Sequence, residues 1–332
     1  MDDRLAALER WLTQKFAGVP FELANASEDA SFRRYFRARL ADGRGYIVMD
    51  APPEREDCTP FVRVARLLRG AGVNAPEVHA DDLGQGFLLL TDLGTTTFLA
   101  ALDEQNADDL MRDATAALLR WQLATRAGEL PPYDDALLRR EMGLFPDWYV
   151  GQHLRRTLSA EQQRALQDVV ALLVRSALAQ PQVYVHRDYM PRNLVVCEPN
   201  PGVLDFQDAV IGPIAYDMVS LMRDAFLSWD EERVLDWTAR YWEQAKKAAL
   251  PVDRDFAEFW RAFEWMGLQR HLKVMGIFAR LTYRDGKPKY VADTPRFVRY
   301  ARAVAGRYAA LAPLARLLDE LEGRAPQTRY SF

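Results

Sequence analysis

Residues 186–208 combine the residue types that phosphoryl transfer from a nucleotide requires. Asp188 follows His186 and Arg187, Asn193 comes five residues after Asp188, and Asp205 comes seventeen residues after it. Phosphoryl transfer needs one carboxylate that meets the acceptor hydroxyl, and an amide oxygen and a second carboxylate that hold Mg²⁺ on the phosphates. Asp188 fits the first role, and Asn193 and Asp205 fit the second.

Short apolar runs next to these residues predict how they are held. Residues 183–185 are typical of a strand that leads into the Asp188 loop, 194–196 of a strand after Asn193, and 203–204 of a strand that enters Asp205. The sequence Pro-Asn-Pro-Gly at 199–202 indicates a hairpin turn. We therefore expect the three side chains at strand ends that face one cleft. A lone His-Arg-Asp is more often a salt-bridged turn, but a spaced set of three is far more specific.

The His-Arg-Asp triplet with Asn five residues later resembles the catalytic loop of protein kinases. The sequence IGPIAYD at 211–217 instead resembles the aminoglycoside phosphotransferase and choline kinase family, which phosphorylates small molecules. The resemblance implies a two-lobed, α+β, protein-kinase-like fold, with an antiparallel sheet plus helix in the N-lobe and a mainly helical C-lobe. It also implies that Asp217 starts a helix and braces the loop that His186 and Arg187 shape. Simple helix capping would place an acid there too.

Three segments are together similar to bacterial cell-wall sugar kinases: YIVMDAPPE (46–54), GVLDFQDAVIGPIAYD (202–217) and GLQRHLKVMGIFARL (267–281). Those enzymes phosphorylate N-acetylmuramic acid and N-acetylglucosamine at the anomeric hydroxyl during peptidoglycan recycling. The resemblance implies ATP as the phosphoryl donor, Mg²⁺ as the metal and a small amino sugar as the acceptor. The alternatives are a kinase for aminoglycosides or other small molecules, and a non-catalytic pseudokinase that binds nucleotide.

Composition excludes several other classes of protein. The 332 residues are 49% apolar and 27% charged, which is ordinary for a globular chain long enough for two lobes. The net charge of −4 gives no support for a nucleic-acid partner. Cys58 and Cys197 form no metal-binding spacing and are typical of reduced cytoplasmic thiols. The N-terminal segment is an amphipathic helix rather than a signal peptide, and no uncharged run approaches the ~20 residues that span a bilayer. We expect a cytoplasmic protein without a membrane partner.

The order of the expected elements indicates two lobes. Helical patterns at 5–12 and 61–68 and strand patterns at 35–40, 46–49, 76–78 and 86–90 precede a mostly helical region. That region has helical patterns at 107–125, 158–178, 216–228, 230–248, 253–282 and 294–321. We predict a nucleotide-binding lobe with its hinge at 1–93, and a catalytic and acceptor-binding lobe at 94–332. The resemblance implies that backbone groups around Leu90 and Asp92 face the adenine, although a plain core strand would look the same.

Two features of kinase nucleotide-binding lobes are missing. Strand 46–50 has no Lys to hold phosphates, and helix 61–68 has no Glu to pair with it. The sequence ASFRRY at 30–35 replaces the glycine-rich loop. We expect Arg33 or Arg34 to supply the cation, helped by backbone N–H groups near Ser31, because an arginine can bind phosphate oxygens with two donors. Adjacent strand residues point to opposite sides, so only one of the two should reach phosphate. The missing Lys is the support for a pseudokinase.

Basic residues recur along one face of the helix expected at 253–282 and just beyond it. The steps along this face are three or four residues long, through Arg270, Lys273, Ile277, Arg280 and Arg284. The simpler interpretation is a solvated face whose apolar stems lie on the core. The alternative is that Arg270 and Lys273 bind the acceptor. The lactyl carboxylate of N-acetylmuramic acid suits these cations, whereas a polycationic aminoglycoside would require carboxylates.

Overall fold

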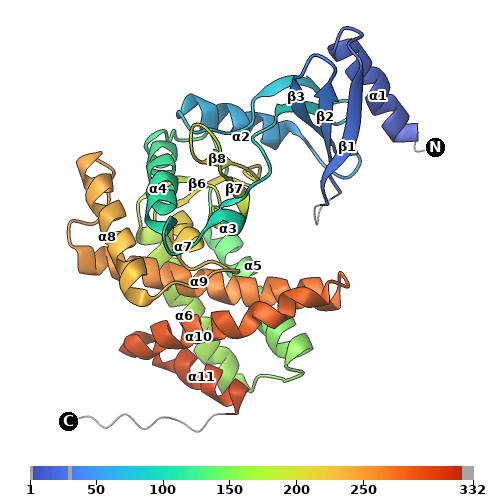
Figure 1. The fold of residues 1–332 in the computed structure, drawn as a ribbon. Coiled ribbons are helices and arrows are strands. Elements are labelled where there is room, and N and C mark those ends of the chain that lie inside the picture. Colours follow the sequence, from blue (N-terminus) through green and yellow to red (C-terminus); the bar gives the residue numbers. More distant parts are fainter. Residues whose placement is uncertain (1–2, 29–31, 324–332) are drawn as a thin grey trace. The chain divides into compact units, whose positions relative to one another are not determined.

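The computed structural model describes residues 3–28 and 32–323, and the chain divides into two compact units. Unit 1 comprises residues 1–121 and 191–209, and unit 2 comprises residues 122–190 and 210–332. The mixed α+β class is confirmed, with an antiparallel sheet near the N-terminus and a mainly helical remainder (Figure 1). Within the described ranges, no helix combines the length and apolarity needed to cross a membrane.

Unit 1 is built on a five-stranded antiparallel sheet with the strand order β1-β2-β3-β5-β4. The strands are β1 (Phe21–Glu28), β2 (Arg34–Leu40), β3 (Gly45–Asp50), β4 (Val78–Asp82) and β5 (Phe87–Thr91). Alternate residues of β2, namely Phe36, Ala38 and Leu40, are buried in a core that includes Leu8 and Leu12 of α1 (Asp3–Lys15). Helix α1 therefore covers one face of the sheet (Figure 1), and the intervening residues of β2 point to the opposite face.

The second part of unit 1 is a hairpin of β7 (Leu194–Val195) and β8 (Gly202–Val203), which confirms the predicted strand–turn–strand. Backbone hydrogen bonds join it to the first part: the Val203 N–H donates to the Asn74 carbonyl at 2.7 Å, and the Val196 N–H donates to the Thr96 carbonyl at 2.8 Å. Helices α2 (Thr59–Gly70), α3 (Phe98–Ala101) and α4 (Ala107–Leu123) complete this region. Unit 1 therefore includes residues 94–121 and 191–209, which lie outside the nucleotide-binding lobe predicted at 1–93. The assignment of residues 1–93 to nucleotide binding stays a prediction.

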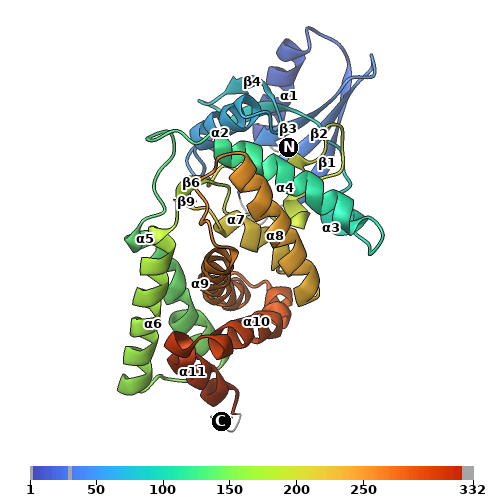
Figure 2. The same cartoon turned by 90° about the vertical axis from the view of Figure 1, so that its left-hand side faces the viewer.

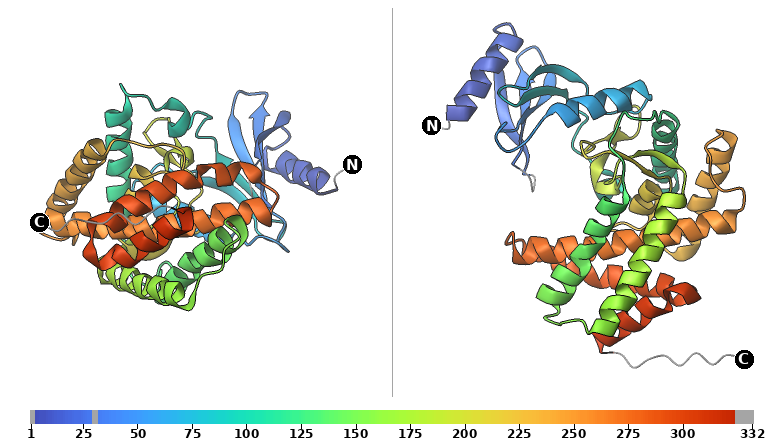
Figure 3. Two further views of the ribbon diagram at one scale, coloured as in Figure 1. Left: turned by 90° about the horizontal axis from the view of Figure 1, so that it is seen from below. Right: turned by 180° about the vertical axis from the view of Figure 1, so that it is seen from behind.

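Unit 2 is organised around α9 (Phe256–Tyr283), whose residues 266–276 are all buried. A helix that is buried on every side must have neighbours on every side. Figure 2 views α9 nearly end-on, with α5 (Asp135–Leu144) and α6 (Ala160–Ala179) on one side and α8 (Glu231–Lys247) on the other. The π-helical segment Phe145–His153 and α7 (Tyr216–Met222) also contact α9. Helix α10 (Thr294–Arg307) packs on α9, and α11 (Ala312–Glu322) packs on α6 and α10 (Figure 3).

The strands β6 (Gln182–Val185) and β9 (Val210–Pro213) form a small antiparallel sheet in unit 2, so the predicted strand at 183–185 is confirmed. Two predicted helices are shorter than expected. The helix at 216–228 ends at Met222, and the Asp224 carboxylate just beyond accepts hydrogen bonds from the backbone N–H groups of Ala225 and Phe226. The helix at 294–321 is two helices, because the chain is extended at Tyr308 and Pro313 suits the start of a new helix.

Gly276 of α9 packs against Leu144, the last residue of α5, and this close packing predicts a stability effect. A Cβ atom at position 276 would overlap the backbone carbonyl of Leu144. We expect Gly276→Ala to lower the free energy of unfolding by about 1–3 kcal/mol in urea denaturation. Gly143→Ala on α5 is the matched control, since a Cβ there meets nothing within 4 Å. It should raise stability by about 0.5–1 kcal/mol. Equal stabilities for the two variants would contradict the observed helix contact.

Candidate active site

A cavity of about 340 Å³ lies on the face of the unit 1 sheet that α1 does not cover. Four predicted site residues line it: Leu90 and Asp92 from the end of β5 and the segment after it, and Asn193 and Asp205 from the hairpin region. The structure therefore brings the predicted hinge and the predicted metal ligands to one cavity. The remaining walls are mostly apolar and include Ile47, Phe61, Val195, Leu204 and Phe206.

Asn193 and Asp205 are neighbours in this cavity. The Asn193 Nδ2 donates to Asp205 Oδ2 at 3.3 Å, and Gln207 Nε2 donates to Asp205 Oδ1 at 3.0 Å. The backbone of Asp205 is left-handed, with φ of +61°. Such a conformation costs a non-glycine residue roughly 1–3 kcal/mol and is often found at functional sites.

The chemistry of this pair suits Mg²⁺, which prefers oxygen ligands from one or two carboxylates together with substrate phosphates. An amide oxygen and a carboxylate oxygen are the donors that Asn193 and Asp205 offer. Over residues 3–28 and 32–323, no cluster of three or more His, Cys, Asp or Glu side chains could hold a metal ion by itself. A metal shared between this pair and bound phosphates therefore fits the residues better than an all-protein cage.

Arg37 is a cavity residue that the sequence interpretation missed. Its guanidinium contacts Asp92 twice, with Nε donating to Oδ2 at 2.6 Å and Nη2 donating to Oδ1 at 3.1 Å. Burial opposes ionisation of Asp92, but Arg37 and the Gly94 N–H outweigh this and lower the pKa of the carboxyl group. Asp92 is thus fixed as a carboxylate within unit 1. A role in nucleotide binding for Leu90 and Asp92 stays a prediction for their backbone groups.

The two arginines predicted to hold phosphate belong to different environments. Arg34 donates to the fully buried Asp50 carboxylate at 2.9 Å, and Asp50 also accepts from Arg4 of α1 at 2.7 Å. Arg34 therefore lies on the α1 face of the sheet. Arg33 donates instead to Glu56 at 3.2 Å. Neither Arg33 nor Arg34 lines the cavity. Ser31 lies outside the described residues.

Tyr35, Arg37 and Arg192 line the cavity and were not predicted. Strand alternation could have found the first two. Phe36, Ala38 and Leu40 are the apolar members of β2, so the odd-numbered residues must share the other face, and Arg33 directly precedes them. Nothing in the sequence marks Arg192 beyond its position next to Asn193.

In unit 2, Asp188 lies in the loop that follows β6, and this loop is braced by Asp217 of α7. The Asp217 carboxylate accepts from the backbone N–H of His186 at 2.6 Å and of Arg187 at 3.0 Å. Burial raises the pKa of Asp217 to about 7, although both N–H groups and the positive charge of Arg270 act in the opposite direction. The contact is the one that the resemblance implied. The contributions of His186, Arg187 and Asp217 to catalysis stay predictions.

Arg270 and Lys273 are buried, with 4% and 6% of their surfaces exposed, so the solvated-face interpretation is wrong for both. The Lys273 Nζ lies 2.9 Å from Glu141 Oε1 and 2.9 Å from the Tyr216 hydroxyl. The Arg270 Nη1 donates to the Arg187 carbonyl at 3.1 Å and to the Tyr216 hydroxyl at 3.3 Å. By contrast, 55% of the Arg284 side chain is exposed. Contact of Arg270 and Lys273 with the acceptor stays a prediction.

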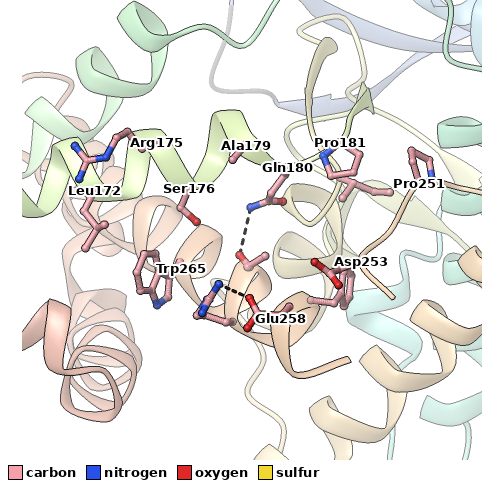
Figure 4. Close-up of a pocket in the computed structure, with 14 residues that line it drawn as sticks. Leu172, Arg175, Ser176, Ala179, Gln180, Pro181, Pro251, Asp253, Glu258 and Trp265 are labelled. Carbon is pink, nitrogen blue, oxygen red and sulfur yellow. Dashed lines mark hydrogen bonds and ion pairs between the residues drawn. The ribbon is translucent and has the colours of Figure 1, made fainter. Parts of the chain in front are cut away.

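A larger cavity of about 690 Å³ lies in unit 2, where residues of α6 such as Leu172 and Ser176 face residues of α9 such as Trp265 (Figure 4). No residue predicted to bind or react lines it. Its Arg261 pairs with Glu258 on the same helix, a charge pair within the protein itself. The smaller cavity of unit 1 is therefore the better candidate for nucleotide binding.

Comparisons with known proteins agree with this chemistry. Residues 22–260 match the phosphotransferase enzyme family. The chain is similar to the N-acetylmuramate/N-acetylglucosamine kinase of Pseudomonas putida, with 52% identity over 98% of each chain. It is also similar to the protein of the same name from Pseudomonas aeruginosa, with 55% identity over 91% of this chain and 89% of the relative. The fold resembles that of ADP-bound aminoglycoside phosphotransferase APH(2'')-Ib, with a TM-score of 0.58 and 14% identity over 90% of this chain and 98% of the other.

Arg33 does not line the cavity itself, but it directly precedes the β2 residues that do, whereas Arg34 lies on the α1 face of the sheet. We therefore predict different effects of the two residues on nucleotide affinity. Arg33→Ala should weaken ATP binding about tenfold or more in a calorimetric titration, because a hydrogen bond from a charged group contributes about 1.5–3 kcal/mol. Arg34→Ala should leave the affinity unchanged and instead lower the free energy of unfolding, because it removes one of the two cations that Asp50 contacts. If Arg34→Ala weakened binding and Arg33→Ala did not, the face assignment would be wrong. If neither mattered, Arg37 and Arg192 would be the next candidates.

Proposed function

This chain belongs to the phosphotransferase enzyme family, and from that premise we propose that it transfers the γ-phosphoryl group of ATP to the anomeric hydroxyl of N-acetylmuramic acid or N-acetylglucosamine. One structural observation carries the kinase chemistry: Asn193 and Asp205 share one cavity with Leu90 and Asp92, the residues predicted to face the adenine. The similarity to named amino-sugar kinases over nearly the whole chain supports the acceptor. A place in peptidoglycan recycling and a cytoplasmic location follow from this proposal.

In the proposed reaction, ATP occupies the unit 1 cavity. The apolar side chains of Ile47, Phe61 and Leu204 are suited to a flat, largely apolar base, and the segment after β5 offers backbone groups for its polar edge. Asn193 and Asp205 would hold Mg²⁺ at the phosphates. When bound, the metal neutralises charge on the transferring group.

Asp188 orients the acceptor hydroxyl and takes its proton as the phosphoryl group is transferred. The loop that carries Asp188 has its backbone fixed by the buried Asp217, so little reorganisation is needed when the acceptor binds. A carboxylate in this position contributes more in the transition state than in the ground state, because the hydroxyl becomes more acidic as its oxygen bonds to phosphorus.

A pseudokinase is disfavoured by the set of groups that are present. The usual Lys–Glu ion pair is missing, but Arg33 forms an ion pair with Glu56. Arg33 lies directly before β2, and Glu56 lies in the segment that follows β3. Arg37 and Arg192 add two further cations at the cavity. An arginine can bind phosphate oxygens with two donors, so loss of the Lys does not remove the means to hold phosphate.

The two carboxylates should fail in different ways when they are replaced. Asp188→Asn should lower kcat by about 10²–10⁴-fold, the usual contribution of a general base, and leave Mg-ATP affinity near that of the wild type. Asp205→Ala should weaken Mg-ATP binding about tenfold or more and abolish the dependence of ATP affinity on Mg²⁺. Near-normal kcat for Asp188→Asn would refute the base assignment. Unchanged Mg-ATP affinity for Asp205→Ala would refute the metal assignment.

The acceptor is tested with Mg-ATP and a panel of sugars, with the phosphorylated product identified by mass spectrometry and phosphorus NMR. N-acetylmuramic acid and N-acetylglucosamine should be phosphorylated at the anomeric oxygen. Their 1-O-methyl glycosides are matched controls, because they lack only the free anomeric hydroxyl, and they should not react. Kanamycin should be a poor substrate. Reaction of the glycosides or efficient phosphorylation of kanamycin would overturn the proposal.

A further inference from the structure

We propose that Glu141, Tyr216, Arg270 and Lys273, here called the α9 clamp, are positioning residues that hold the backbone next to Asp188 in unit 2. This role deepens the proposed kinase function and rests on it. It differs from the sequence-based expectation that Arg270 and Lys273 bind the acceptor sugar, and the two roles predict opposite kinetic results.

The clamp acts on the peptide group between Arg187 and Asp188. Arg187 is left-handed, with φ of +78°, a conformation that non-glycine residues adopt only when their surroundings impose it. Arg270 donates to the Arg187 carbonyl at 3.1 Å, while Asp217 accepts from the N–H groups of His186 and Arg187. The backbone that leads into Asp188 is thus held through its carbonyl by one helix and through its N–H groups by another.

The Arg187 side chain is held by the same cluster. Its Nη2 donates to Glu141 Oε1 at 2.6 Å, and Glu141 also pairs with Lys273 and accepts from the Tyr133 hydroxyl. Tyr216 closes the ring, because its hydroxyl contacts both Lys273 at 2.9 Å and Arg270 at 3.3 Å. Every link from Arg187 through the clamp and back to the Arg187 carbonyl is a direct polar contact.

Burial explains why these cations serve the loop rather than an exchangeable ligand. Burial disfavours the charged forms of Lys273 and Arg270, but their anionic and polar neighbours, including Asp188, outweigh it and raise the pKa of both groups. Both cations therefore stay charged at neutral pH. The groups that contact these two cations belong to the protein itself, and each cation is less than a tenth exposed. A side chain with this environment can set where Asp188 lies without touching the sugar.

The decisive variant is Arg270→Lys, which keeps the buried charge but loses the reach and the fork of the guanidinium. If Arg270 is a positioning residue, kcat of this variant should fall by about 10²-fold, as expected for a misplaced catalytic group. The KM values for ATP and both sugars should change little. The ratio of kcat/KM for N-acetylmuramic acid to that for N-acetylglucosamine should not change. Arg261→Ala is the matched control on α9, because 50% of that side chain is exposed, and it should behave as wild type.

An acceptor-binding role predicts the reverse. Arg270→Lys would keep a kcat near that of the wild type, and Arg270→Ala would raise KM for N-acetylmuramic acid alone with kcat unchanged. That result would overturn the clamp. Lys273→Met is a second variant that removes a different link while retaining an unbranched side chain. It should lower kcat for both sugars equally, and selective loss of the acidic sugar would again overturn the proposal.

Hydrogen exchange separates failure of the clamp from failure of the proposed function, because it needs no acceptor. A peptide that spans residues 184–190 should exchange faster in Arg270→Lys and Lys273→Met than in wild type and Arg261→Ala, while peptides from the unit 1 sheet stay unchanged. Unchanged exchange in this peptide would refute the clamp even if the protein phosphorylates sugars. Faster exchange in a protein that phosphorylates no amino sugar would refute only the proposed acceptor.

Discussion

The organisation of unit 2 depends on one buried carboxylate, that of Glu141. Burial opposes its ionisation, but Lys273 and Arg187 outweigh this and lower its pKa, so it stays an anion between two cations. Removing one partner from such a buried group leaves an uncompensated charge, which typically costs 3–5 kcal/mol. The same anion fixes the Arg187 side chain and orders Lys273 beside Tyr216. One carboxylate on α5 thereby couples the packing of α9 to the shape of the Asp188 loop.

Unit 1 also uses carboxylates to fix arginines, and here two carboxylates hold the arginines of β2 on opposite faces of the sheet. Asp50 holds Arg34 on the face covered by α1, and Asp92 holds Arg37 on the face with the cavity. Arg34 is bound to a fully buried carboxylate on the α1 face and is not available to a ligand in the cavity, whereas Arg37 and its partner Asp92 both line the cavity.

Much of this arrangement could be read from the sequence, and the exceptions have physical causes. The hairpin around Asn193 and Asp205 was predictable because short apolar runs and a Pro-Gly turn act locally. The assignment of that hairpin to unit 1 was not, because it depends on backbone bonds from Val203 to Asn74 and from Val196 to Thr96, which are 129 and 100 residues apart in sequence. Burial of Lys273 was also hidden, since its partner Glu141 lies on another helix and helical periodicity identifies a face without saying what covers it.

Strain ties these observations to function. The two non-glycine residues with left-handed backbones in the predicted catalytic segment are Arg187, directly before Asp188, and Asp205 itself. Each is stabilised within its own unit: Arg187 by Asp217 and Arg270, and Asp205 by the amides of Asn193 and Gln207. A strained conformer persists only when its neighbours over-determine it. The hydrogen bonds to Asp217 and Arg270 favour the observed backbone conformation at Arg187, and those from Asn193 and Gln207 fix the carboxylate of Asp205. The residues that surround Asp188 and Asp205 therefore matter to the chemistry even though they need never touch a substrate.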